Sequence, residues 1–115
     1  MRYHYILEGK EPRPAQLLEW ATWFETANRT VARSEVAGLT ISTVFMGLNQ
    51  SMGIGPPLLF ETMVFDETEP IDSMQIRYAT WAEAETGHMD ICEQLIEMDN
   101  LSKDMMIKSI ERRGK

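Results

Sequence analysis

Residues 80–98 read TWAEAETGHMDICEQLIEM, the strongest local structural signal in the chain. The stretch opens as a capping box, in which the Thr80 hydroxyl accepts from the Glu83 amide and the Glu83 carboxylate reaches the Thr80 amide. Apolar side chains then recur at helical spacing, which predicts an amphipathic helix over residues 81–98, ended by Asp99 and Asn100. Its predicted inner face comprises Trp81, Ala84, His88, Ile91, Cys92 and Leu95, and its opposite face comprises Glu83, Asp90, Glu93 and Glu97.

The segments before this helix predict several strands and one more helix. Alternating side chains predict strands over residues 3–7, 39–46 and 74–79, and a run of mixed polarity predicts one over 30–36, with a Gly-containing hairpin turn at residues 37–38 and an acidic turn at 66–72. Residues 58–65 are apolar on both faces except for Glu61 and Thr62, which predicts a central strand covered on both sides. Apolar residues spaced at 3.6 predict a helix over residues 15–28. Residues 9–14 are predicted to break the first strand, with Pro14 in the first helical turn.

This order predicts an α+β fold. An antiparallel sheet of four to five strands is packed on one face by two amphipathic helices, in the order β-α-β-β-β-β-α. The second face of the sheet also carries apolar residues, which a second layer or a second copy of the chain would cover. We expect one domain over residues 1–101, followed by a basic segment over 102–115 that forms a tail or one short helix containing Met106, Ile107 and Ile110.

Composition restricts the classes of protein that the chain can represent. Its 115 residues suffice for one domain with its own core. The single Cys92 excludes an internal disulfide, and one Cys with two His cannot supply a four-ligand Cys/His zinc site, so we expect no metal and no cofactor. No stretch approaches the roughly 20 apolar residues of a membrane span. We therefore expect a cytoplasmic protein without membrane contact.

The charge is distributed unevenly along the chain. Net charge is −7, and residues 61–99 contain eleven acidic residues against one basic residue, Arg77. After Ser102 the sign reverses, with five basic and two acidic residues. An acidic body argues against direct nucleic-acid binding by the main domain, because phosphate contacts need Lys and Arg. The acidic residues either keep the protein soluble or meet a partner protein with a basic surface.

The glycine-rich loop over residues 47–57 is predicted to be a connector or a mobile contact loop that presents Asn49, Gln50 and Met52. A phosphate-binding loop is excluded on physical grounds. The loop contains no Lys or Arg, and it leads into a strand, so that no helix N-terminus is presented to an anion.

Two pairs of residues invite both a structural and a functional interpretation. His88 is predicted to be a hydrogen-bonded core residue, with Gly87 allowing a close approach to the sheet. Arg77 is predicted to pair with Glu61 across neighbouring strands. The functional alternative is a ligand pocket, and its residues would be Arg77, Tyr78, Trp81, His88, Glu61, Asn49 and Gln50. The sequence contains no recognisable pattern of a nucleophile, a base and a group that orients the base, which favours a non-enzymatic protein.

Several segments together resemble a family of small proteins encoded by bacteriophages and prophages. The resemblance is carried by LLEW (17–20), WFE (23–25), STVFMGL (42–48), PPLLFETMVF (56–65), RYATW (77–81), EA (83–84) and GH (87–88). It covers roughly residues 3 to 92 and leaves out the tail after Ser102. The resemblance implies a phage accessory protein that acts inside an infected bacterium, and it carries no catalytic residue.

Our leading hypothesis is a non-enzymatic phage protein that binds and inhibits a host protein, such as a CRISPR effector or another antiviral-defence component. Its contact residues would be Glu83, Asp90, Glu93 and Glu97. Three alternatives stay open at this point: a protein that sequesters a nucleotide signal in the ligand pocket above, a structural or regulatory phage oligomer, and a hydrolase that uses Glu61 or His88.

Overall fold

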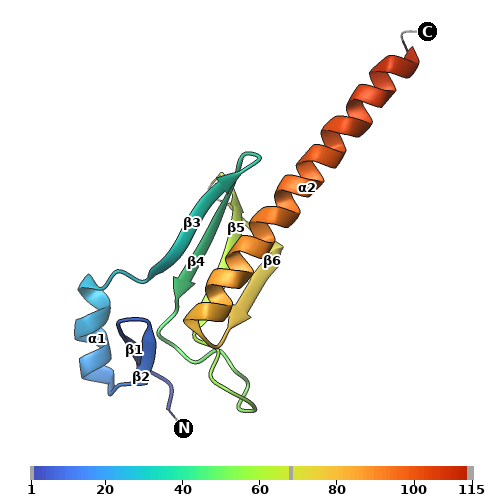
Figure 1. The fold of residues 1–115 in the computed structure, drawn as a ribbon. Helices are drawn as coiled ribbons and strands as arrows, with labels where there is room; N and C mark the ends of the chain where they lie inside the picture. The colour runs from blue at the N-terminus through green and yellow to red at the C-terminus, as the bar shows by residue number, and fades with distance from the viewer. Residues whose placement is uncertain (1, 68, 114–115) are drawn as a thin grey trace.

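Two antiparallel sheets and two helices make up the computed structural model, which describes residues 2–67 and 69–113 (Figure 1). The elements follow in the order β1 (Tyr5–Glu8), β2 (Glu11–Pro14), α1 (Leu17–Thr26), β3 (Thr30–Val36), β4 (Leu39–Phe45), β5 (Phe60–Asp66), β6 (Glu69–Tyr78) and α2 (Trp81–Arg113). The predicted α+β class is confirmed. The two terminal residues of the predicted basic segment, 114–115, lie outside the described residues.

The larger sheet has the strand order β3-β4-β5-β6, and every neighbouring pair is antiparallel. Ala37 and Gly38 join β3 to β4 with positive φ angles of 53° and 82°, the backbone geometry that suits a tight hairpin. The predicted acidic turn at 66–72 is shorter than expected, because β6 begins at Glu69. Pro70 is compatible with this strand because β6 lies at the edge of the sheet.

Alternating residues of β4 and β5 build the core against α2. The registered pairs Ile41–Val64, Thr43–Thr62 and Phe45–Phe60 are fully buried. The alternation predicted for the 39–46 strand is thereby confirmed, since Ile41, Thr43 and Phe45 lie on one face of the sheet. Ala84, Ile91 and Leu95 of α2 complete this core, and α2 crosses the sheet on that face (Figure 1).

The helix α2 is longer than the sequence patterns indicate. The prediction that it ends at Asp99 and Asn100, followed by a separate short helix, is wrong, because one helix continues to Arg113. Ion pairs of one helical turn, Asp99–Lys103 (2.9 Å) and Asp104–Lys108 (3.2 Å), support the continuation. No Gly or Pro lies between His88 and Arg113 to stop it.

The N-terminal segments form a unit of their own at one end of the larger sheet (Figure 1). The prediction that residues 9–14 only interrupt a strand is wrong: β2 pairs with β1, and Pro14 lies opposite Tyr5 instead of in a helix. Two prolines fit here because β2 has β1 as its one strand neighbour. The helix α1 lies against β1 and meets the larger sheet through Trp23, whose ring is edge-on to Phe45 at 5.8 Å.

The second half of α2 projects beyond the sheet and gives the molecule its elongated outline (Figure 1). The principal extents are 69 × 30 × 22 Å, and the radius of gyration is 18.5 Å. A compact chain of this length has a radius of gyration of about 13 Å. The difference arises because α2 continues to Arg113, whereas Leu95 is the last buried residue among those of α2 whose side chains are described.

Candidate functional site

Four predicted carboxylates share one exposed face of α2. We call Glu83, Asp90, Glu93 and Glu97 the acidic face, and all four are exposed. Their spacings of seven, three and four residues place them along one side of a helix. Ala84, His88, Ile91 and Leu95 occupy the opposite, buried side. The predicted separation of the two faces of this helix is therefore confirmed, although contact with a partner stays a prediction.

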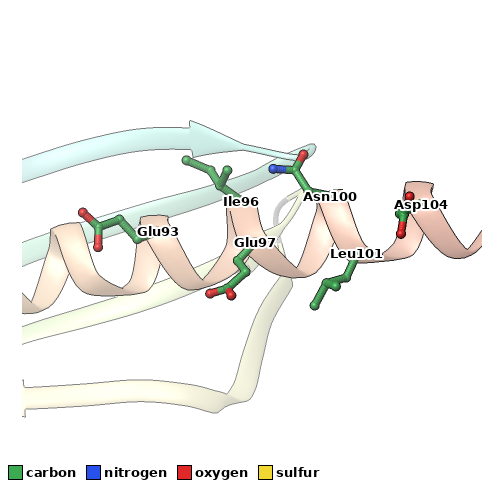
Figure 2. A pocket seen from close by; sticks show the side chains of 6 residues that line it. All are labelled: Glu93, Ile96, Glu97, Asn100, Leu101 and Asp104. Atoms are coloured by element: carbon green, nitrogen blue, oxygen red, sulfur yellow. The ribbon is translucent and has the colours of Figure 1, made fainter.

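The acidic face continues along α2 into a shallow hollow of about 450 Å³. Figure 2 shows the side chains that line it, all from this one helix: Glu93, Ile96, Glu97, Asn100, Leu101 and Asp104. A single convex helix cannot enclose a small molecule on several sides. With carboxylates flanking Ile96 and Leu101, the hollow suits contact with another macromolecular surface.

Glu83 also has a local role at the start of α2. Its amide donates to Thr80 Oγ1 (3.1 Å), as the capping-box pattern predicts. Its carboxylate accepts from the Thr80 hydroxyl (3.1 Å) instead of the predicted Thr80 amide. Glu83 is therefore partly engaged in holding the first turn, whereas Asp90, Glu93 and Glu97 make no side-chain hydrogen bond or ion pair with any described residue.

His88 anchors α2 to the sheet through both ring nitrogens. Its Nδ1 lies 2.7 Å from Thr43 Oγ1, and its Nε2 lies 2.8 Å from Ser34 Oγ. Thr43 is in turn hydrogen-bonded to Thr62. The ring is 3% exposed, and burial lowers the pKa of His88. The predicted core role of His88 is confirmed, since its polar atoms are used inside the fold.

The Ser34–His88–Thr43 cluster was not foreseen from the sequence. A hydroxyl beside a neutral imidazole is an arrangement that nucleophilic enzymes also use. Here the ring lies between the sheet and α2, and its hydrogen bonds fix how the helix sits on β3 and β4. His88 lies about 25 to 55 positions after Ser34, Thr43 and Thr62, too far for any local sequence pattern to connect them. The register of the strands brings these residues together.

Gly87 lies directly beneath the Tyr78 ring. A Cβ at position 87 would lie 2.3 Å from Tyr78 Cε1 and Oη, so the close approach predicted for Gly87 is confirmed. Tyr78 is buried, and desolvation raises the pKa of its hydroxyl, opposed by the Thr62 hydroxyl. A second open hollow lies beside this contact, lined by Tyr78, Ala82, Glu83, Thr86, Gly87 and Asp90. The contact fixes the start of α2, including two residues of the acidic face.

Arg77 and Glu61 form the predicted cross-strand pair. They are registered partners on β6 and β5, and Arg77 Nε donates to Glu61 Oε2 at 3.0 Å. Gln75 Nε2 donates to the same oxygen at 2.6 Å. Glu61 is 4% exposed, so these donors satisfy a buried carboxylate. The pair lies on the sheet face away from α2, because its neighbour Thr62 points toward His88.

The residues of the alternative ligand pocket are divided among separate places. His88 and Tyr78 lie under α2, whereas Glu61 and Arg77 lie on the other face of the sheet. Trp81 is half-buried and packs edge-on to Phe60 at 6.1 Å. Asn49 Oδ1 accepts from the amides of Ser51 (2.9 Å) and Leu58 (3.2 Å), and the Gln50 amide donates to the Leu58 carbonyl. The structure thus gives Asn49 a role in shaping the 47–57 loop.

The described part of the chain contains no group of three or more His, Cys, Asp or Glu side chains placed to hold a metal ion. Within residues 2–67 and 69–113, no helix is long and apolar enough to cross a membrane. No protein family, curated protein or solved structure matches this chain.

Proposed function

We propose that this protein is a non-enzymatic phage accessory protein that binds a host protein through the acidic face of α2 and inhibits it. The observation that supports binding is the row of four exposed carboxylates on a helix whose other side is fixed to the sheet. The phage setting rests on the sequence resemblance described above. A nucleic-acid-binding component of antiviral defence, such as a CRISPR effector, is the class of target that we propose.

The charge of α2 supports a basic partner. Residues 81–102 contain six acidic residues and no Lys or Arg. Carboxylates in a row create a negative potential that attracts a complementary basic surface and speeds the encounter with it. Proteins that hold nucleic acid expose such basic surfaces for phosphate contacts. A bound acidic helix would occupy that surface and exclude the nucleic acid.

The rigidity of the helix supports specific recognition. Ala84, Ile91 and Leu95 are buried, and His88 is hydrogen-bonded to two strands. These contacts hold Asp90, Glu93 and Glu97 in fixed relative positions before any partner arrives. A preorganised surface loses less conformational entropy on binding than a mobile one.

The proposal is tested with two variants that change the net charge equally. The face variant carries Asp90→Lys, Glu93→Lys and Glu97→Lys, which spares the capping residue Glu83. The control variant carries Glu25→Lys, Glu35→Lys and Glu85→Lys, three exposed acidic residues outside the acidic face. Each purified protein is immobilised and exposed to bacterial host lysate, and bound proteins are identified by mass spectrometry.

We expect a basic host protein to be retained by the wild type and by the control variant, and lost with the face variant. Circular dichroism and thermal unfolding establish that both variants remain folded. Equal capture by the face variant and the wild type would refute a role for the acidic face. Loss of capture with both variants would show that only the total charge matters, which also contradicts a specific contact.

A further inference from the structure

The projecting half of α2, residues 98–113, carries apolar side chains that are more than half exposed between Met98 and Ile110. With Ile96 at its base, the exposed apolar residues of this region are Ile96, Met98, Leu101, Met105, Met106, Ile107 and Ile110. Isolated apolar side chains on a surface are ordinary, but a cluster this dense marks an interaction surface.

Most of these side chains extend the face that packs on the sheet. Met98, Ser102, Met105 and Ser109 follow Leu95 at alternating steps of three and four residues. Met106 and Ile110 lie in the row that begins at Cys92, beyond the ion pair of Asp99 and Lys103. At 100° per residue, the buried face of the first half therefore continues past the end of the sheet. Ile96, Leu101 and Ile107 lie outside this continuation, and Ile96 and Leu101 line the hollow beside the acidic face (Figure 2).

The projecting half of α2 lacks the packing of one face from which most helical stability in proteins comes. The exposed ion pairs Asp99–Lys103 and Asp104–Lys108 contribute little. A complementary apolar face that covers Met98, Met105 and Met106 would supply the missing packing.

We propose that the projecting half of α2 pairs in antiparallel orientation with the same half of a second copy of this chain. The charges favour this occupant and this orientation. The last turn of α2 carries Arg112 and Arg113 against one carboxylate, Glu111, which gives it a net charge of +1. The end of the sheet from which α2 emerges carries the exposed acidic turn residues Asp66 and Glu67, because Leu39 packs near Leu95 and is registered with Asp66.

The bulk of the sheet determines the register of the pair. Residues 98–113 extend about 24 Å at 1.5 Å per residue, and a partner helix cannot pack beside Leu95, because the sheet already covers it. Full overlap places Met98 opposite Arg113 of the second copy and centres the pair between Met105 and Met106. The basic tip of each copy then lies over the acidic turn of the other. A parallel pair would bring the two basic tips together.

This inference is independent of the proposed function, because the acidic face lies on the other side of α2 and stays exposed in the pair. The oligomeric state therefore tests it without reference to any host protein. Light scattering coupled to size-exclusion chromatography and sedimentation equilibrium, over a concentration series, measure the mass of the full chain. We expect the measured mass to rise with protein concentration toward twice that of the 13.2 kDa monomer.

Substitutions on the two sides of α2 provide matched variants. Met106→Glu with Ile110→Glu is expected to give a monomer, whereas Leu101→Glu, on the acidic side, is expected to leave the dimer intact. Asp66→Lys with Glu67→Lys is expected to weaken dimerisation by like charge, and Glu25→Lys on α1 is its control. A monomeric wild type at every concentration, or a dimer that survives Met106→Glu with Ile110→Glu, would overturn the proposal.

Cross-linking of single cysteines tests the orientation. In a Cys92→Ser background, cysteine at position 105 faces its own copy near the two-fold axis and is expected to form an intermolecular disulfide readily. Cysteine at position 98 is separated from its copy by about 22 Å in the antiparallel register and is expected not to cross-link. Efficient cross-linking at position 98 would establish a parallel pair and refute the proposed arrangement.

Discussion

Replacing Gly87 by alanine separates the effect of helix propensity from the effect of packing, because the two have opposite signs. Gly87 lies inside α2, and alanine is about 1 kcal/mol more favourable than glycine in a helix interior. Propensity alone therefore predicts that Gly87→Ala stabilises the protein. The structure predicts the reverse, since the new methyl group would lie 2.3 Å from Tyr78 Cε1 and Oη and 2.4 Å from Cζ.

The size of the loss follows from the displacement that the methyl group requires. Carbon atoms pack at about 3.5–4.0 Å, so the Tyr78 ring must move by about 1 Å or more. The ring belongs to a buried cluster with Phe45, Phe60 and Ala84, so it cannot move freely. Overpacking of this kind costs about 1–3 kcal/mol. After the propensity gain, we expect a net loss of about 0–2 kcal/mol in the free energy of unfolding.

Urea unfolding followed by circular dichroism measures the change, and a second substitution identifies its cause. Leucine at position 78 lacks the three atoms that Gly87→Ala would meet. In a Tyr78→Leu background, Gly87→Ala is therefore expected to stabilise the protein by about 1 kcal/mol, so that the two substitutions are strongly non-additive. If Gly87→Ala stabilises the otherwise wild-type protein, the close contact between Gly87 and Tyr78 is refuted.

Three further predictions concern other contacts that hold α2 and the sheet. Because the pKa of His88 is lowered from 6.5 by burial, the unfolded chain binds a proton at a higher pH than the folded chain, and the free energy of unfolding should fall as the pH drops below about 6.5. His88→Leu should lower the free energy of unfolding by about 1–3 kcal/mol at neutral pH and remove that part of its pH dependence. Unfolding titrations at several pH values measure both effects, and a pH dependence that is the same in the variant and the wild type would contradict the buried neutral ring. Thr80→Ala should cost about 1 kcal/mol in urea unfolding through loss of the helix cap, and no change would argue against the hydrogen bond to the Glu83 amide. Arg77→Met should lower the free energy of unfolding by about 1 kcal/mol, because it removes a donor from the buried Glu61 carboxylate. The double change Glu61→Val with Arg77→Val should cost less than this single change, and a larger loss for the double change, measured by calorimetry, would contradict the prediction.

Periodicity predicted most of the elements that position the acidic face. The face division of residues 81–98, the 39–46 strand and the Glu61–Arg77 pair all follow from local spacing and from neighbouring strands joined by short turns. The Thr80–Glu83 cap is a local signal as well. Interactions between residues close in sequence, or in adjacent strands, leave a readable pattern.

The remaining features depend on long-range geometry or on small energy differences. The β1–β2 hairpin was missed because Pro12 and Pro14 argue against a strand, and only its edge position makes them acceptable. The continuation of α2 was missed because Asp99 and Asn100 are weak stop signals, and residues 89–112 contain no Gly or Pro that would end the helix. The Ser34–His88–Thr43 cluster requires the strand register, which the sequence alone does not specify.

The most direct test of partner binding by α2 is to map which residues of this chain contact the host protein in the complex. Isotope-labelled chain is titrated with the host protein captured in the binding experiment, and changes in amide resonances are followed by NMR. We expect the largest changes at Asp90, Glu93 and Glu97, with little change at Gln75 and Arg77 on the opposite sheet face. Changes concentrated on that sheet face or on the 47–57 loop, with the amides of residues 90–97 unaffected, would contradict the account.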